Sequence, residues 1–259
     1  MKIFSTRFIG TLLVLCATLL ITGCAGMQGG GGPQVFDPHR MGSAIGLDDV
    51  GFVRQAVESR TITVNQPIAA MGYEAIPLIA LAARNGAVNV LKYLIAQGAN
   101  VNVRTPDHDT PLMLAAFFFE EGPGGSKVSV RKHEEAVRML VDAGAELENW
   151  GNLYTPLGYA AYQGRDDTLR YLLSRGARVN ADAQARSINI NTPLMMASIQ
   201  GHANVARQLL MAGADAGIRV KGGHTAHELA LKYNHTHMFQ MLTCAERLQS
   251  GESFAQRCK

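Results

Sequence analysis

The chain has 259 residues, of which 47% are hydrophobic and 17% charged, so it can bury a sizeable core and is not a disordered protein. Its formal charge is +3, and loss of Lys2 and Arg7 with a predicted leader would leave 22 of the 24 basic residues against 21 acidic ones. A charge this close to zero gives no basic face, which argues against nucleic acid as a partner.

The first segment, residues 1–23, is predicted to be a secretory signal. Lys2 and Arg7 precede an apolar run from Phe8 to Ile21, which is shorter than the roughly 20 residues of a membrane-spanning helix. The run ends in Ile21-Thr22-Gly23-Cys24, which resembles the bacterial lipobox. This resemblance implies that Cys24 becomes the lipidated first residue, held in a membrane by its acyl chains. An ordinary signal peptide with an incidental cysteine is the alternative.

The residues after Cys24 indicate which membrane holds the anchor and how the anchor is connected to the domain. Ala25 follows Cys24, whereas in enteric-type bacteria an Asp at this place retains lipoproteins in the inner membrane. The resemblance therefore implies an outer-membrane anchor facing the periplasm, with the inner membrane as the alternative. Residues 24–44, which include the run 29–33 of four glycines and a proline, are predicted to be a flexible tether.

From residue 45 to 245 one phrase recurs. Its clearest copies are Thr110-Pro111-Leu112, Thr155-Pro156-Leu157 and Thr192-Pro193-Leu194, each followed by an amphipathic stretch that ends in Gly-Ala. Pro77-Leu78 opens an earlier copy and Thr225-Ala226 a later one, and the five copies start 33, 45, 37 and 33 residues apart. With Gly98-Ala99-Asn100-Val101-Asn102, this period resembles the ankyrin repeat. The resemblance implies an all-α solenoid of stacked helix pairs with short hairpin fingers, made of four fuller units and partial caps, followed by a tail at 246–259.

The residue types of the phrase suit such a unit. The Thr hydroxyl can cap a helix, Pro fits the first helical turn, and the Ala pair lets two helices approach closely. The glycine before each Ala can adopt the left-handed conformation that ends the second helix. Leu47 to Asn65 resembles the second helix of a degenerate first unit. The histidine that follows Thr-Pro-Leu in the family is replaced by Met113, Gly158 and Met195, which implies less rigid units.

The intervals of 45 and 37 residues locate two insertions. The first runs from Phe117 to about Lys132, after which the second helix is predicted to resume at His133. The second, at 180–191, lengthens a finger. Long loops added to an intact repeat array are typical of binding surfaces, although they also occur without a function.

The resemblance also implies where a partner would bind, because ankyrin arrays generally use their finger tips and the inner face of the first helices. Aromatic residues at the centre of this surface are typical of interface hot spots. The alternative is that Phe117 to Phe119 and Trp150 pack within their own loops, although three consecutive residues on a helix cannot all face inward. The predicted partner-binding residues are Arg84, Asn85, Asp107, His108, Asp109, Phe117, Phe118, Phe119, Glu120, Glu121, Trp150, Asn152, Tyr154, Tyr162, Gln163, Asn189, Asn191, Gln200, Lys232 and Tyr233.

No catalytic or metal-binding pattern stands out from the repeats. Residues 122–127 lack the Gly-Lys-Ser/Thr spacing of a phosphate loop. His235 and His237 would point about 200° apart on a helix, and His224 and His227 have ordinary solvated or hydrogen-bonded roles open to them. We expect no cofactor, no metal and no enzymatic activity.

Four cysteines remain to be assigned. Cys16 leaves with the signal and Cys24 takes the lipid, so Cys244 and Cys258 are the thiols of the mature domain. They either form a disulfide, as an oxidising periplasm would allow, or stay as two free thiols.

Together these features predict a monomeric, lipid-anchored protein-binding module. The chain also resembles the small ankyrin lipoproteins found with contact-dependent (type VI) toxin systems, which implies an immunity protein that neutralises a secreted toxin such as a phospholipase effector. The alternative is an envelope accessory protein that stabilises a partner enzyme, for example during oxidative stress.

Overall fold

Short helices in pairs make up most of the chain that the structure describes. The computed structural model describes residues 36–70, 72–117, 127–148, 154–180, 191–219, 223–248 and 252–258, all within one compact unit that starts at Val35. The pairs, in chain order, are α1 (Pro38–Gly46) and α2 (Val50–Glu58), α3 (Leu78–Arg84) and α4 (Val88–Ala96), α5 (Pro111–Ala116) and α6 (Lys127–Asp142), α7 (Pro156–Tyr162) and α8 (Asp166–Ser174), α9 (Pro193–Gln200) and α10 (Ala203–Met211), and α11 (Ala226–Lys232) and α12 (Thr236–Glu246). A last short helix, α13 (Phe254–Arg257), follows them.

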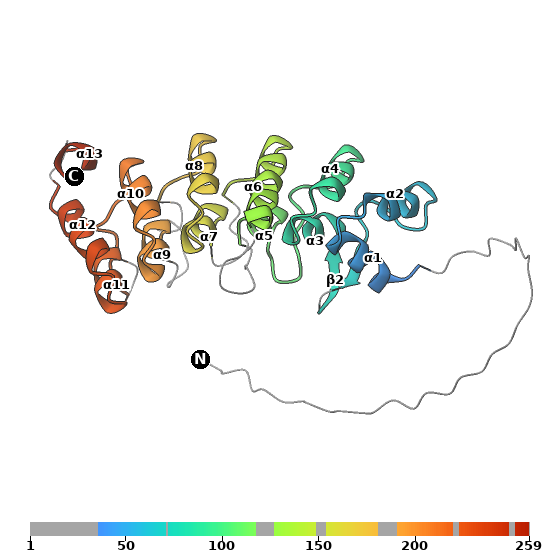
Figure 1. The fold of residues 1–259 in the computed structure, drawn as a ribbon, viewed down its shortest axis with the longest axis horizontal. Coiled ribbons are helices and arrows are strands. Elements are labelled where there is room, and N and C mark those ends of the chain that lie inside the picture. Colours follow the sequence, from blue (N-terminus) through green and yellow to red (C-terminus); the bar gives the residue numbers. More distant parts are fainter. Residues whose placement is uncertain are drawn as a thin grey trace, which may run out of the picture. The chain divides into compact units, whose positions relative to one another are not determined.

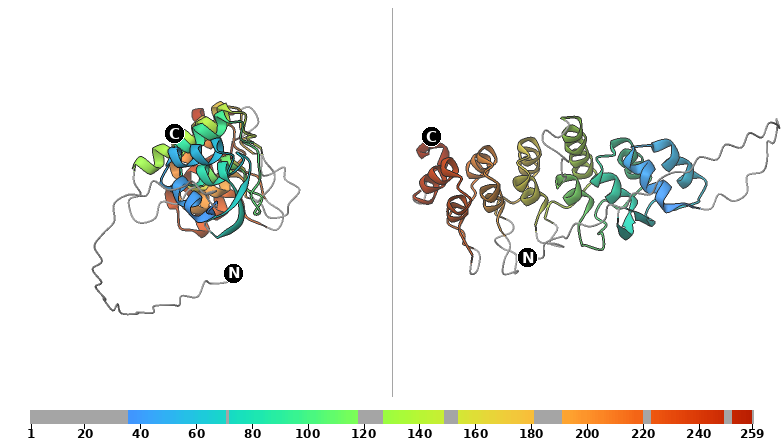
Figure 2. Two further views of the ribbon diagram at one scale, coloured as in Figure 1. Left: turned by 90° about the vertical axis from the view of Figure 1, so that its right-hand side faces the viewer. Right: turned by 60° about the horizontal axis from the view of Figure 1, so that its bottom comes forward.

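The pairs stack into a solenoid. The first helices contact one another in the order α3, α5, α7, α9 and α11, and the second helices do so from α2 to α12. Figure 1 shows the second helices as an upper row with the first helices beneath them, and the end-on view in Figure 2 shows successive pairs overlying one another. The predicted all-α solenoid of stacked helix pairs is confirmed, with six pairs in the described residues.

A threonine begins each first helix from α5 onward. Its backbone is extended and its hydroxyl accepts a hydrogen bond from the backbone N–H three residues later, at 3.1–3.3 Å. These bonds satisfy one of the N–H groups that a helix start leaves without a partner. The cap therefore forms although Met113, Gly158 and Met195 replace the family's histidine. The threonines are Thr110, Thr155, Thr192 and Thr225.

The small residues near the end of each first helix are fully buried. Ala82, Ala115, Ala160 and Ala197 are all at most 1% exposed. Because a methyl side chain takes little room, neighbouring helices of the first row can pack closely there. The apolar face of α4 is buried through Val90, Leu91 and Leu94, with Ile95 half-buried beside them.

Histidines tie neighbouring units together, a role that the sequence analysis did not assign. His202 and His235 precede second helices and His133 lies within α6, and in each case Nε2 lies 3.0–3.1 Å from a backbone carbonyl near the end of an earlier first helix. Burial is the largest effect on His202 and lowers its pKa, so the neutral ring is favoured. The pairs are His133 with Arg84, His202 with Tyr162, and His235 with Ile199.

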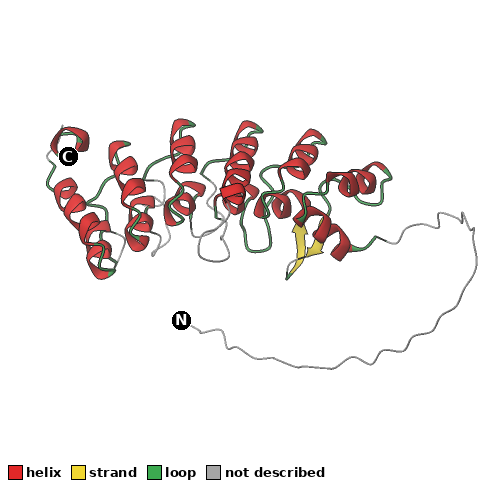
Figure 3. Cartoon of the chain, in the orientation of Figure 1, coloured by secondary structure: helices red, strands yellow, loops and turns green. Residues whose placement is uncertain are grey.

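The finger between the first two units is a β-hairpin. Strand β1 (Pro67–Ala70) pairs antiparallel with β2 (Tyr73–Pro77), with Ile68 opposite Ile76. Both isoleucines are at most 3% exposed, so the hairpin belongs to the core (yellow in Figure 3).

The predicted boundary between tether and domain is wrong. Residues 24–44 were expected to be flexible, but α1 starts at Pro38, where Asp37 caps it by accepting from the backbone N–H of His39. Met41 and Ile45 are fully buried. Helix α1 is therefore the first helix of the first unit, and α2 lies within the predicted stretch Leu47 to Asn65.

Two further boundaries differ from the prediction. The second helix of the third unit was expected to resume at His133, but α6 already begins at Lys127, so part of the predicted insertion is helical. The predicted tail contains α13, whose Phe254 is 5% exposed. Cys244 and Cys258 form a disulfide with their Cα atoms 5.8 Å apart, so this end is joined to α12.

Candidate functional site

A cluster of four aromatic rings lies on the first-helix row at the middle of the stack. Phe117 ends α5, Tyr154 precedes α7, and Tyr159 and Tyr162 lie on α7. The Phe117 ring centroid is 4.6 Å from that of Tyr159 and 6.3 Å from that of Tyr162, and Tyr154 meets Tyr159 edge-on at 5.7 Å. All four side chains are half-buried. We call Phe117, Tyr154, Tyr159 and Tyr162 the aromatic cluster.

The cluster joins two repeats, because Phe117 belongs to the third unit and the tyrosines to the fourth. Rings in tilted and edge-on contact support one another, while their outer edges stay in reach of solvent. A half-buried platform of this kind offers large apolar area at little cost in side-chain entropy, since the rings are already held in place. It is the arrangement expected of a protein-binding surface.

A second aromatic group lies one repeat earlier. The Arg84 guanidinium donates to the hydroxyl of Tyr73 at 2.8 Å and lies 5.6 Å from the centre of that ring. Burial raises the pKa of Tyr73, and Asp107 and Asp109 raise it further while Arg84 lowers it. The finger containing both aspartates thus faces the hairpin finger that carries Tyr73. Arg84, Asp107 and Tyr73 form a polar border on the N-terminal side of the cluster's surface.

The remaining predicted binding residues divide by exposure. His108 lies at a finger tip with a left-handed backbone, φ 66°, and is exposed, whereas Asp109 is half-buried. Asn85 donates to the carbonyl of Leu81 at 2.7 Å, which gives it a structural role. The half-buried residues are Gln163 and Asn191, and the exposed ones are Gln200, Lys232 and Tyr233. Tyr233 is 46% exposed and has the Lys232 ammonium 5.9 Å from its ring centre.

Several predicted residues lie outside the described part of the chain. They are Phe118, Phe119, Glu120, Glu121, Trp150, Asn152, Asn189 and the predicted lipidation site Cys24.

Tyr159 and Tyr73 were missed by the sequence analysis. Tyr159 occupies the place taken by Leu114 and Met196 in neighbouring repeats, where the side chain is buried. A tyrosine at a position that is otherwise aliphatic was a usable signal, because its hydroxyl has to reach a polar partner or solvent. Tyr73 carried no such signal, since its hairpin does not follow the repeat phrase.

The histidines and acidic residues of the described part come together in pairs and not in larger clusters. There, no three His, Cys, Asp or Glu side chains come together in a way that could hold a metal ion. His224 lies 3.4 Å from Glu228, and His227 stacks on Phe239 and lies 3.5 Å from Glu246. Within the same residues, no helix has the length and apolar character needed to cross a bilayer.

Comparison with known proteins agrees with the repeat architecture. Family models described as ankyrin repeats match residues 74–106, 127–183 and 159–210. The mouse protein "Ankyrin repeat and SOCS box protein 16" is 40% identical over 105 residues, which is 40% of this chain. The match spans only 22% of that relative's length, so it bears on the repeats and not on the relative as a whole.

Proposed function

Because the described domain is an ankyrin-repeat solenoid, a protein–protein interaction module, we propose that it binds a folded protein through the surface formed by its first-helix row and fingers. The observation that carries this proposal is the aromatic cluster, where two repeats jointly present four half-buried rings. Hot spots at interfaces are enriched in aromatic residues with a surrounding polar border, and Arg84 with Asp107 supplies such a border.

We further propose that the module is lipid-anchored at Cys24 and faces the periplasm. The support is the sequence Ile21-Thr22-Gly23-Cys24 after a short apolar run. The disulfide between Cys244 and Cys258 is compatible with this location, since disulfides persist in oxidising compartments such as the periplasm.

Our preferred biological role is immunity, in which the module covers a secreted toxin such as a phospholipase effector at the membrane that the toxin attacks. The support is the resemblance to ankyrin lipoproteins of type VI toxin systems and the combination of an anchor with a binding surface. The alternative role is an envelope accessory protein that stabilises an enzyme, for example under oxidative stress.

Replacing Phe117 with Ala is expected to weaken capture of the partner by about 2 kcal/mol, roughly 30-fold in Kd, as for a typical hot spot. The full chain serves as bait in an extract of its own cells, and the retained protein is identified, purified and titrated against each variant. Phe117 packs on Tyr159, so some loss of stability is also expected from this change.

The matched control is Tyr171→Ala on α8. Tyr171 is also half-buried, but it lies on the second-helix row beneath the guanidinium groups of Arg138 and Arg175. Its loss should reduce stability without changing Kd. Equal weakening by both variants would show that the partner does not bind at the aromatic cluster.

A competition assay separates the two roles. Deleting the gene should make cells vulnerable to toxin-delivering siblings if the protein confers immunity, and Phe117→Ala should not restore full protection. The accessory role would instead be favoured if the deletion made cells sensitive to peroxide but left their survival beside toxin-delivering siblings unchanged.

A further inference from the structure

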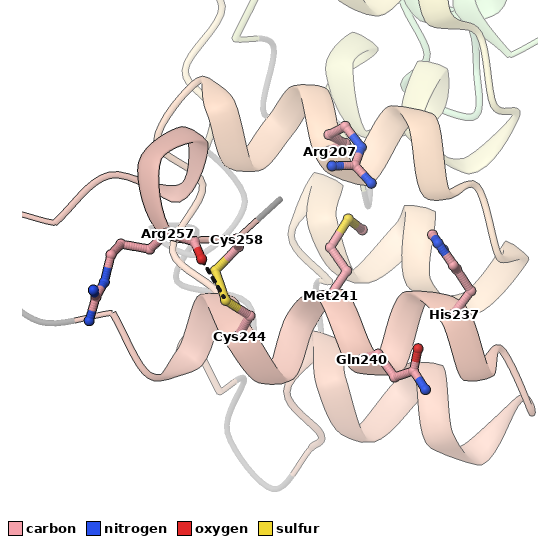
Figure 4. Close-up of a pocket in the computed structure, with 7 residues that line it drawn as sticks. All are labelled: Arg207, His237, Gln240, Met241, Cys244, Arg257 and Cys258. Carbon is pink, nitrogen blue, oxygen red and sulfur yellow. Dashed lines mark hydrogen bonds between the residues drawn. A yellow bond between two sulfur atoms is a disulfide. The ribbon is translucent and has the colours of Figure 1, made fainter.

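A cavity of about 230 Å³ lies at the C-terminal end of the solenoid, away from the aromatic cluster. Its lining includes Arg207 from α10, His237, Gln240 and Met241 from α12, and the disulfide of Cys244 and Cys258. Figure 4 shows the Arg207 side chain reaching from α10 towards α12 above Met241, with the His237 ring on the same side of α12. The nitrogen-bearing side chains of Arg207, His237 and Gln240 therefore line the same cavity.

Arg207 is unusual among the arginines of the described residues. Only Arg165 and Arg207 are half-buried, the others being exposed, and Arg165 has other interactions. Within the described ranges, neither Arg207 nor His237 nor Gln240 forms a hydrogen bond or ion pair. None of the Arg207 nitrogens is among the buried atoms without a partner, and His237 and Gln240 are exposed, so all three side chains are open to a ligand from solvent. An anion in the cavity would give the Arg207 guanidinium charge-assisted hydrogen bonds that it lacks within the described residues.

The chemistry of the lining favours an oxyanion. Among the described residues, no Asp or Glu side chain lines the cavity. Arg257 also lines the cavity, but its guanidinium points away from it and its charge is balanced by Glu252, whose carboxylate lies 3.1 Å from Nε. The volume is several times the roughly 30 Å³ that one water occupies in the liquid, which leaves room for a phosphate group.

We propose that this cavity is a phosphate-group site, in which the Arg207 fork donates to the phosphate oxygens and Gln240 and His237 donate from α12. Free phosphate and a phospholipid headgroup present the same phosphate oxygens to these donors. This site is independent of the proposed partner surface, because it lies on the second-helix row and on another repeat.

The test measures thermal unfolding of the full chain by circular dichroism in increasing phosphate, against chloride at equal ionic strength. Phosphate should raise the midpoint in a saturable way, because a ligand that binds only the folded state stabilises it. Arg207→Gln should weaken phosphate binding at least about tenfold, the loss expected for charge-assisted hydrogen bonds.

The matched control is Arg247→Gln, an exposed arginine at the end of α12 that does not line the cavity. It should respond to phosphate as the unchanged chain does. Circular dichroism of Arg207→Gln at low temperature checks that this variant folds, and Arg207→Lys should retain part of the response because it keeps the charge.

The second arm identifies the source of the phosphate. Flotation with vesicles of phosphatidylcholine mixed with phosphatidylglycerol uses both variants in a form that begins at Ala25, ahead of the compact unit that starts at Val35, so that no acyl chain on Cys24 binds the vesicles. It should separate Arg207→Gln from Arg247→Gln if the site takes a headgroup. A response to free phosphate alone assigns the site to the soluble ion. The proposal would be overturned if phosphate did not raise the unfolding midpoint in a saturable way and both variants also bound the vesicles equally.

Discussion

Replacing Cys258 with Ser is expected to lower the free energy of unfolding at the C-terminal end by about 3 kcal/mol. The disulfide joins Cys244 to Cys258 across a sequence separation of 14, and closing a loop of about this length removes chain entropy worth roughly 3 kcal/mol from the unfolded state. The same bond holds α13 in place, where Phe254 is buried beside α10. Because each repeat contacts only its neighbours, the loss should first appear as early unfolding of the last unit.

Chemical denaturation followed by circular dichroism, with and without a reductant, measures this effect. The reductant should bring the unchanged chain down to the level of Cys258→Ser and should leave that variant as it was. If the reductant leaves the unfolding curve of the unchanged chain where it is, the bond does not support the domain.

The repeats could be predicted from the sequence because the features that define them are local. A threonine that caps its own helix, a proline in the first turn and a buried alanine pair act within a few residues of one another. Each therefore leaves a mark at a fixed spacing along the chain. The spacing also located the insertions, although it could not show that α6 extends back to Lys127.

The ends of the domain could not be predicted in the same way. Helix α1 contains two glycines and few strong helix formers, so its local sequence does not favour a helix. It forms because Met41 and Ile45 are buried in contacts with β1 and α3, which lie farther along the chain. Helix α13 likewise depends on a disulfide to α12 and on burial of Phe254.

The candidate site, too, could be predicted only where it depends on local features of the sequence. The positions after each alanine pair identified Phe117 and Tyr162, since the repeat phrase fixes where those side chains lie. The contact of Phe117 with Tyr159 joins two repeats and depends on how they stack, so the sequence did not reveal it. The cavity at Arg207 was missed for a similar reason, because α10 and α12 belong to different repeats.

Replacing Gly164 with Ala is expected to destabilise the domain by about 3 kcal/mol, through two separable effects. Gly164 has φ 67°, a left-handed conformation that costs a residue with a Cβ roughly 1–2 kcal/mol. An added Cβ would also lie 2.6 Å from Nδ1 of His202, closer than such atoms can approach. Displacing the ring would break its bond to the Tyr162 carbonyl, and overpacking of this kind typically adds ~1–3 kcal/mol.

Gly98 separates the two effects because it shares only the first. Its φ is 80°, and a Cβ there would meet no atom within 4 Å, so Gly98→Ala should cost only about 1–2 kcal/mol. The free energies of unfolding of both variants are measured by urea denaturation under the same conditions. In a His202→Ala background the clash is absent, and Gly164→Ala should then cost no more than Gly98→Ala. If both glycine variants lowered the free energy of unfolding equally in the unchanged background, the His202 ring would be able to move aside without an energetic penalty. Its hydrogen bond between the fourth and fifth units would then contribute little to the stability of the stack.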